Sequence, residues 1–202
     1  MSQFLVIHPD NPQLRLIRLA AKVILDGGIL VYPTDSAYAL GCRLENKSGF
    51  DRICQIRQIE EDHPFTLICQ DLSQISTYAT IDNTAFRVLK SHTPGAYTFI
   101  LSATKEVPKR LLQPKRLTIG LRIPESAILQ ALLNELQEPM MSVSLILPHH
   151  EAPFEDAKEI HDLLGNQVDA VIDGGPCGLT PTTVIDLVDG EQRVVRVGKG
   201  VV

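Results

Sequence analysis

Hydroxyl side chains gather in four short segments of this sequence, each next to an expected strand. The segments contain Thr34 and Ser36, Thr98, Ser142 and Ser144, and Thr182 and Thr183. Hydroxyl groups both donate and accept hydrogen bonds, so beside a few arginines they can hold a nucleotide or an amino acid without a metal cage. Each segment taken alone is more typical of turns, where Ser, Thr, Pro and Gly are common. Together, the segments predict a small-molecule site if the fold brings them to one place.

The sequence lacks the motifs that mark many active sites. Neither G-x-x-x-x-G-K-[ST] nor G-x-G-x-x-G occurs, and H-E-x-x-H and G-x-S-x-G are also missing. The 4 cysteines form no C-x-x-C pair and have no His at ligand spacing, which predicts reduced core or wall thiols and favours them over a catalytic thiol. The adjacent His149 and His150 point to opposite sides of an extended segment, so they do not easily share an ion. We therefore expect no metal ion held by the protein itself.

Residues 105–116 carry five cations and one acid, although the whole protein has a net charge of -5. Such a cluster suits the phosphates of a nucleic acid. The alternative is a solvated helix face with flanking turns, and the acidic balance argues against a uniformly basic nucleic-acid binder. No aromatic stacking set accompanies the cations, so single-stranded bases are not the expected ligand. The candidate RNA-binding residues are Lys105, Lys109, Arg110, Lys115 and Arg116.

Alternating helix and strand patterns must position these side chains, and they indicate an α/β protein. Asn11 and Pro12 predict the start of a helix that Gly27 and Gly28 end, and a buried strand follows at 29–32. Short gaps between the last strands leave no room for helical crossovers, so the sheet is expected to be mixed. Further strands are expected at 65–69, 97–101, 117–123, 140–146, 170–173, 184–187 and 194–197, and helices near 49–58, 71–78, 83–91, 125–137 and 155–164.

A chain of 202 residues is long enough for one real core, and we expect a single domain over 1–202. The sequence is 44% hydrophobic and 21% charged, which excludes the disordered and fibrous classes. No apolar run approaches the roughly 20 residues that cross a bilayer, and the N-terminus lacks the pattern of a secretion signal. We expect a cytoplasmic protein without a membrane partner, whose oligomeric state the sequence leaves open.

Five motifs follow one another along the chain at 32–42, 94–99, 119–124, 173–175 and 182–186. They read YPTDSAYALGC, PGAYTF, IGLRIP, DGG and TTVID. Five ordered matches are hard to obtain by chance, and from Gly27 to Gly200 the chain resembles the YrdC/YciO family of threonylcarbamoyl-AMP synthase-like proteins. The N-terminal MSQF and the segment RICQIRQ resemble the YciO branch of that family.

The resemblance implies a twisted, open, mixed sheet with helices on its faces and a concave, positive surface. Members of the family make threonylcarbamoyl-AMP from threonine, bicarbonate and ATP, the first step toward a tRNA modification, and members are described as binding double-stranded RNA. ATP would bring Mg²⁺ as part of the substrate complex. The implied substrate-binding residues are Thr34, Thr98 and Ser142, and the implied nucleotide- and phosphate-binding residues are Arg57, His63, Arg122, Ser144, Thr182 and Arg196.

The chain departs from the synthase pattern where phosphates are expected. A lysine, an arginine and a second lysine of the family are here Arg57, Ile59 and His63, and an asparagine is replaced by Ile146. Loss of one preorganised donor costs about 2.7–4 kcal/mol, or roughly 100- to 1,000-fold in rate. We therefore expect a retained nucleotide pocket with weakened synthase-type activity. The alternative is a non-catalytic protein that binds double-stranded RNA or tRNA and whose pocket takes a regulatory nucleotide.

Overall fold

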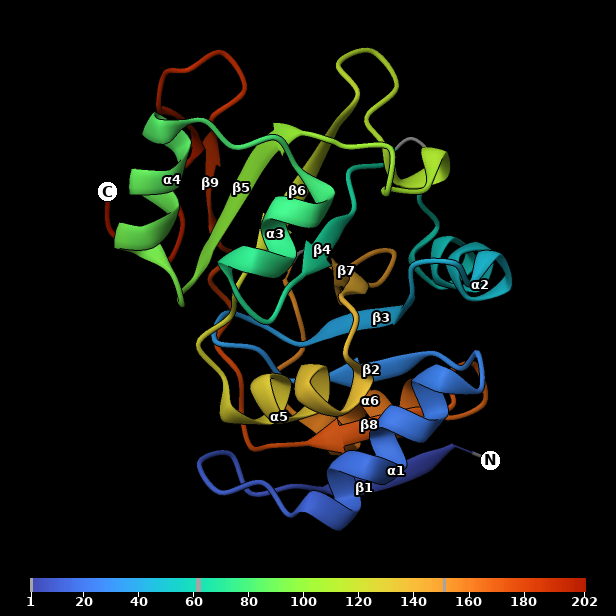
Figure 1. The fold of residues 1–202 in the computed structure, drawn as a ribbon. Helices are drawn as coiled ribbons and strands as arrows, with labels where there is room; N and C mark the ends of the chain where they lie inside the picture. Colours follow the sequence, from blue (N-terminus) through green and yellow to red (C-terminus); the bar gives the residue numbers. More distant parts are fainter. Residues whose placement is uncertain (1, 61–62, 151) are drawn as a thin grey trace.

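Ten strands form one continuous mixed sheet in the computed structural model, which describes residues 2–60, 63–150 and 152–202. The strand order is β1-β8-β2-β3-β7-β4-β6-β5-β9-β10, and the strand direction turns across the sheet, which is strongly twisted (Figure 1). Neighbours are parallel in β1–β8 and β5–β9 and antiparallel in β3–β7 and β5–β6, which confirms the expected α/β class with a mixed sheet. The strands are β1 (Gln3–Val6), β2 (Leu30–Tyr32), β3 (Ala39–Arg43), β4 (Thr66–Ile68), β5 (Tyr97–Ser102), β6 (Thr118–Arg122), β7 (Met140–Ser144), β8 (Ala170–Asp173), β9 (Thr183–Asp186) and β10 (Arg193–Arg196).

The described residues also form six α-helices, and polar side chains cap five of them. Asn46, Asp71, Asp82, Ser126 and Asp156 each accept a hydrogen bond from a backbone N–H of the first helical turn. Across the described ranges, no helix combines the length and apolar character that a membrane span requires. The helices are α1 (Leu14–Leu25), α2 (Lys47–Arg57), α3 (Leu72–Tyr78), α4 (Asn83–His92), α5 (Ala127–Leu136) and α6 (Ala157–Leu164), with a 3-10 turn at Lys109–Leu111.

Helices cover the two halves of the sheet differently. On β2, Leu30 and Tyr32 pack into a core with α1 and α5, whereas Val31 packs into the core on the opposite face, which α6 shares. That second core continues under α3 and α4; in Figure 1, α3 lies in front of the sheet near β6 and β4, and α4 lies to the left beside β9. The face that α1 and α5 cover on one half is left without a described helix over β7, β4, β6, β5 and β9. This uncovered face is where a ligand has access.

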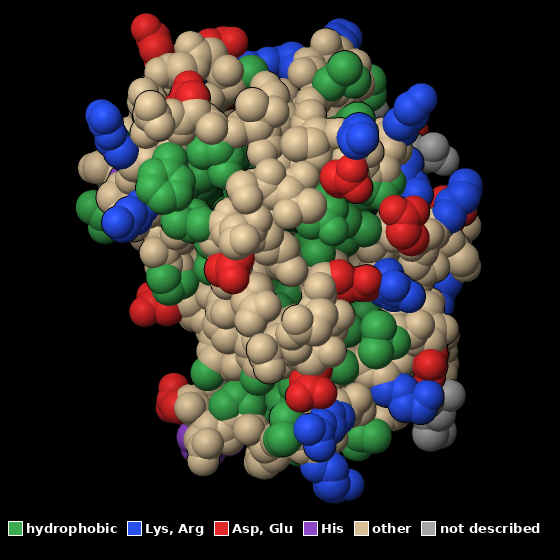
Figure 2. Space-filling view, viewed as in Figure 1, with side chains coloured by type: hydrophobic (Ala, Val, Ile, Leu, Met, Phe, Trp, Pro, Cys, Tyr) green, Lys and Arg blue, Asp and Glu red, His purple; other side chains and the backbone are tan. Residues whose placement is uncertain are grey.

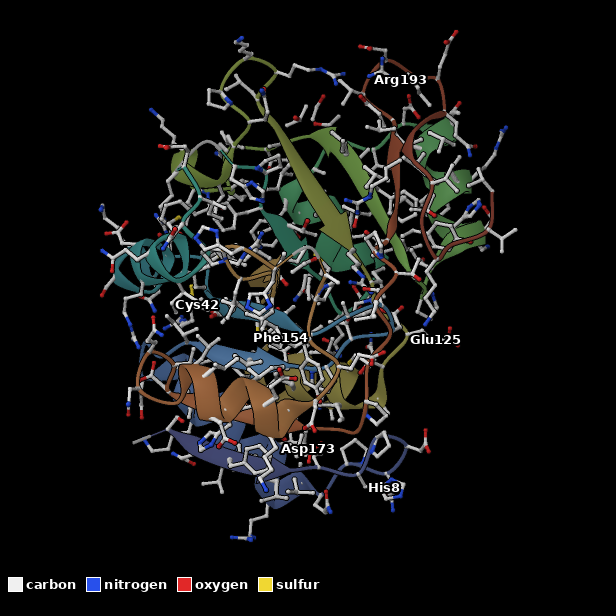
Figure 3. All side chains as sticks on the ribbon, turned by 180° about the vertical axis from the view of Figure 1, so that it is seen from behind. His8, Cys42, Glu125, Phe154, Asp173 and Arg193 are labelled. Carbon is white, nitrogen blue, oxygen red and sulfur yellow. The ribbon has the colours of Figure 1, made fainter. Side chains whose placement is uncertain are left out.

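The N-terminal segment differs from the expectation in two ways. Gln3–Val6 forms an edge strand parallel to β8 that the pattern did not predict, because three of its four side chains are exposed. The first helix begins at Leu14, so the prediction that Asn11 and Pro12 start it is wrong. The cause is the loop around His8 (Figure 3), whose Nδ1 accepts the backbone N–H of Asn11 at 3.1 Å and holds that residue outside the helix.

The remaining expected elements are present, β8 with the expected bounds and the others with ends shifted by a few residues, and β3 is a strand that the pattern did not identify. All 4 cysteines are free and buried, which confirms their prediction as reduced core thiols. Burial raises the pKa of Cys42 to about 12 and that of Cys177 to about 11, so both thiols stay protonated at neutral pH.

Candidate functional site

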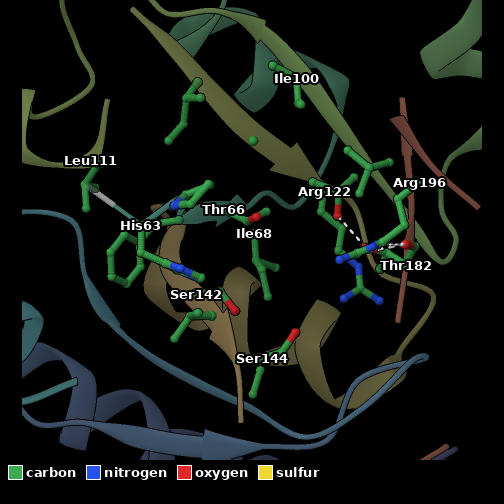
Figure 4. A pocket seen from close by; sticks show the side chains of 18 of the residues that line it. His63, Thr66, Ile68, Ile100, Leu111, Arg122, Ser142, Ser144, Thr182 and Arg196 are labelled. Carbon is green, nitrogen blue, oxygen red and sulfur yellow. Dashed lines mark hydrogen bonds between the residues drawn. The ribbon is translucent and has the colours of Figure 1, made fainter. Parts of the chain in front are cut away.

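A cavity of about 530 Å³ lies on the uncovered face of the sheet (Figure 4). Its floor is a row of register partners that crosses four strands: Ser142 on β7, Thr66 on β4, Gly120 on β6 and Ile100 on β5. Three of these four side chains are small or absent, so the sheet itself supplies the hollow. The register that aligns them is a property of the fold, and the sequence gives no local signal for it.

All nine residues that the family resemblance assigned to substrate, nucleotide or phosphate line this one cavity. They come from the loop after β2, the end of α2, the segment before β4, and strands β5, β6, β7 and β10 with the residue before β9. The structure therefore brings the four hydroxyl segments to one place, and their roles stay predictions. The nine residues are Thr34, Arg57, His63, Thr98, Arg122, Ser142, Ser144, Thr182 and Arg196.

Two arginines of the cavity carry a charge that no acid balances within the described residues. Arg57 donates to the backbone carbonyl of Ser144, and burial lowers the pKa of its guanidinium, which stays charged at neutral pH. Arg196 donates through Nε and a terminal nitrogen to the carbonyl oxygen of Thr182, at 3.1 and 2.9 Å. A guanidinium has five N–H donors, so each side chain is held in place and still has donors for an anionic ligand.

Arg122 is different because its charge is balanced. Its guanidinium donates to Oδ1 of Asp35, and the two side chains are 8% and 11% exposed. Burial lowers the pKa of Arg122, and the contact with Asp35 opposes that shift. Oδ2 of Asp35 accepts the backbone N–H of Glu125 at 2.9 Å, whereas Nε of Arg122 is buried without a partner in the described structure. This ion pair joins the loop after β2 to the end of β6 at the cavity wall.

The hydroxyl groups are not equally available to a ligand. Thr34 donates its one proton to the carbonyl of Ala37 at 2.6 Å and accepts two backbone N–H groups at 3.1 Å, so its hydroxyl already stabilises its own loop. The hydroxyls of Thr98 and Thr182 lie 2.8 Å apart. Ser142 is paired with a buried phenol, Tyr32, at 2.6 Å. Several cavity hydroxyls are therefore oriented by neighbours before any ligand binds.

Three of the four departures from the synthase pattern, those other than the conservative change to Arg57, do not share one environment. His63 and Ile146 line the cavity, and the His63 ring stands edge-on to Phe65 with 6.0 Å between centroids. Ile59 is half-buried against the core and is not among the described residues that line the cavity. Lining residues that the sequence analysis missed include Thr66 and Gly120, whose only signal is the cross-strand register.

The basic segment contributes less free charge than its composition predicts. Arg110 donates to the carbonyl of Leu44, and Arg116 pairs with Asp186 at 2.6 Å while lining the cavity. In Figure 2, basic and acidic side chains lie interspersed along the right-hand side of the face. Lys105, Lys109 and Lys115 are exposed and form no ion pair within the described residues. Three lysines thus remain as candidates for phosphate contacts. The segment forms a short 3-10 helix at Lys109–Leu111 with flanking turns, so the alternative of a solvated surface face stays open beside RNA binding.

The structure shows no candidate metal-binding site in the part of the chain that it describes. No group of three or more His, Cys, Asp or Glu side chains is placed there to hold an ion. The expectation that Mg²⁺ arrives only with ATP stays a prediction.

The fold and the cavity define a class: α/β proteins with an open, twisted sheet whose uncovered face carries hydroxyl and guanidinium groups. The family model Sua5_yciO_yrdC, described as telomere recombination, matches residues 22–198. The chain belongs to this Sua5/YciO/YrdC family, which confirms the family expected from the five motifs.

Sequence and structure comparisons relate this chain to several members of the family. It is 58% identical to protein YciO of Escherichia coli K12 over 99% of this chain and 97% of that one, and the crystal structure of E. coli YciO matches with a TM-score of 0.95. A threonylcarbamoyl-AMP synthase of Hydrogenovibrio crunogenus is 34% identical over 66% of this chain and 74% of its own. The structure of P. abyssi Sua5 complexed with L-threonine has a TM-score of 0.89 at 23% identity, covering 98% of this chain and 58% of that one, and it supports the fold alone.

Proposed function

We propose that the cavity binds an adenine nucleotide together with L-threonine and makes threonylcarbamoyl-AMP at a low rate. The observation that carries the proposal is the pair of guanidinium groups, Arg57 and Arg196, that line one hollow with oriented hydroxyls and have no acid partner within the described residues. Phosphates are the ligand that such groups suit best. The volume, about 530 Å³, lies within the range of small-molecule sites. The relatives named threonylcarbamoyl-AMP synthase support the same reaction class.

In this proposal one group of cavity residues binds the nucleotide and another binds the amino acid. Arg57, Arg196, Arg122, His63, Ser144 and Thr182 face the nucleotide and its phosphates. Thr98 and Ser142 face the amino acid, and Thr34 lies beside them with its hydroxyl occupied in its own loop. The amine nitrogen of threonine attacks the carbon of bicarbonate, and water leaves to give the N-carboxy (carbamate) form of threonine. An oxygen of this new carbamate then attacks the α-phosphorus of ATP, and pyrophosphate leaves. Arginines that are already anchored on backbone carbonyls stabilise the developing phosphate charge without having to reorganise.

Calorimetric titration with ATP tests the binding step. Charge-assisted hydrogen bonds contribute about 1.5–3 kcal/mol, so Arg57→Ala and Arg196→Ala should each weaken binding about 10- to 150-fold. Arg87→Ala is the matched control, because Arg87 is exposed on α4 and does not line the cavity. No detectable heat at millimolar ATP, or equal affinities for all four proteins, would contradict the proposal.

The low rate is attributed to the two donors missing at Ile59 and Ile146 and to the histidine that replaces a lysine at His63. The triple change Ile59→Arg, His63→Lys and Ile146→Asn should raise the release of pyrophosphate from ATP in the presence of threonine and bicarbonate. The wild-type protein and the triple variant are compared at equal concentration after both are shown to be folded. A fast wild-type enzyme, or a folded triple variant that gains nothing, would show that these positions do not limit the rate.

RNA binding is the second candidate function, favoured by three exposed lysines within eleven residues of chain. Lys105, Lys109 and Lys115 have no acid partner in the described structure, so all three are available to phosphates. Three phosphate contacts would give a log–log salt slope of about -2 to -3, with little sequence preference. Filter binding of double-stranded RNA should therefore weaken with salt, and the three lysine-to-glutamate changes should remove it. Equal affinity of wild type and triple variant would exclude this segment as the contact.

A further inference from the structure

Tyr32 lies behind the cavity and reaches it through one hydroxyl. The side chain is fully buried at the end of β2 and is not among the described residues that line the cavity. Its phenol oxygen lies 2.6 Å from Oγ of Ser142, which does line the cavity (Figure 4). The phenol passes over Gly41, where a Cβ would lie 2.7 Å from that oxygen and 2.8 Å from the carbonyl of Met141. A glycine is needed at this point of β3 for the contact to form.

Burial fixes the direction of this hydrogen bond. The phenol carries one proton, and no other acceptor for it lies within hydrogen-bond distance in the described structure. If Ser142 donated to Tyr32, the phenolic proton would be buried without an acceptor, which is strongly unfavourable. Burial also raises the pKa of Tyr32, so the phenol keeps its proton. Tyr32 is therefore the donor and Ser142 the acceptor.

The proton of Ser142 is left for the cavity. Within the described residues its hydroxyl has no second partner, and a serine hydroxyl that already accepts one bond satisfies itself best by donating. We infer that Tyr32 is a positioning residue that fixes Ser142 as a hydrogen-bond donor toward an anionic oxygen of the ligand. This inference rests on the proposed function, because that oxygen belongs either to a phosphate of the nucleotide or to the carboxylate of the amino acid.

The test combines Tyr32→Phe, Ser142→Ala and the double variant, each titrated calorimetrically with AMP alone and with L-threonine alone. Tyr32→Phe should weaken binding of one ligand roughly 2- to 12-fold, because the Ser142 proton loses its fixed direction. In the Ser142→Ala background the same change should have no further effect, since Tyr32 touches the ligand only through Ser142. Loss of AMP affinity identifies a phosphate oxygen, and loss of threonine affinity identifies the carboxylate.

Tyr38→Phe is the matched control. Tyr38 is a second buried tyrosine, its hydroxyl donates to the carbonyl of Gly175 at 2.8 Å, and it is not among the described lining residues. Its variant should lose comparable thermal stability while keeping both affinities. The inference is overturned if Tyr32→Phe binds both ligands as the wild type does, or if its effect persists without the Ser142 hydroxyl. A wild-type protein that binds neither ligand overturns the proposed function, and with it this assignment.

Discussion

The change Asp35→Asn should destabilise the protein by about 3–5 kcal/mol, because it removes the carboxylate that balances a buried guanidinium. Asp35 and Arg122 are 11% and 8% exposed, so water screens their charges little. The asparagine that replaces Asp35 can still accept the backbone N–H of Glu125, which Asp35 accepts at 2.9 Å. The expected loss of stability therefore comes from the unpaired charge of Arg122, because the hydrogen bond that holds the loop is kept.

Urea unfolding at pH 7, followed by circular dichroism, gives the free energy of unfolding for each variant. Asp26→Asn is the control, because Lys22 and Asp26 form an ion pair at 2.7 Å whose side chains are 70% and 61% exposed. An exposed pair contributes about 0–1 kcal/mol, so the control should remain close to the wild type. A loss at Asp35 no larger than the loss at Asp26 would refute the reasoning.

A double variant, Asp35→Leu with Arg122→Met, separates charge from packing. Replacing both partners of a buried pair by apolar side chains is often neutral or stabilising, so the double variant should recover most of the loss. A double variant as unstable as Asp35→Asn would show that the side-chain shapes, and not the charges, hold this wall together. The single variant should also gain more thermal stability from inorganic phosphate than the wild type does, because its cavity then holds one more unbalanced cation.

Two further outcomes follow from buried titratable groups. Burial raises the pKa of Asp186, but hydrogen bonds from Arg116 and Arg193 outweigh it and leave the pKa below its ordinary value. The carboxylate therefore stabilises the fold above about pH 4, and Asp186→Asn should unfold more easily than the wild type at pH 7, with a difference that narrows as the pH falls below about 4. The pKa values of Cys42 and Cys177 are raised, so the folded protein should react slowly with a disulfide reagent at pH 8. All 4 thiols should react once the protein is unfolded in guanidinium. Fast reaction of the folded protein would contradict this expectation.

The sequence predicted elements best where local pattern and burial agree. The strand at β8 and the helix at α4 have apolar runs or capped amphipathic patterns, and both were found close to their expected bounds. β3 was missed because Ala39–Arg43 contains small residues, which lack the β-branched or aromatic character of a typical strand. Their size is set by packing against the neighbouring strands. Gly41 is the clearest case, since it leaves room for a phenol from the adjacent strand. Such a demand comes from tertiary contacts, and no local pattern reports it.

The sequence predicted which residues form the candidate site, but it did not predict which of its arginines are paired with an acid. The family resemblance assigned nine side chains to substrate, nucleotide or phosphate, and in the structure all nine line one cavity, while their roles stay predictions. The resemblance did not show that Arg122 is balanced by Asp35 while Arg57 is not. It also did not show that Arg116, assigned to RNA, pairs with Asp186 beside the cavity. These differences depend on contacts between residues that lie 70 or more positions apart.

The contrast between Ile59 and Ile146 predicts which departure has the larger effect on the proposed reaction. Ile59 follows Gln58, whose left-handed backbone (φ 49°) ends α2, and its side chain packs against the core. An arginine there must leave that packing before it reaches the cavity. Ile146 already lines the cavity, and its backbone N–H donates at 3.1 Å to the carbonyl of Ser144, which also accepts from Arg57. An asparagine at this position adds a donor beside a guanidinium that is already anchored. Ile146→Asn alone should therefore raise pyrophosphate release more than Ile59→Arg alone, and the reverse order would place the missing phosphate contact at the end of α2.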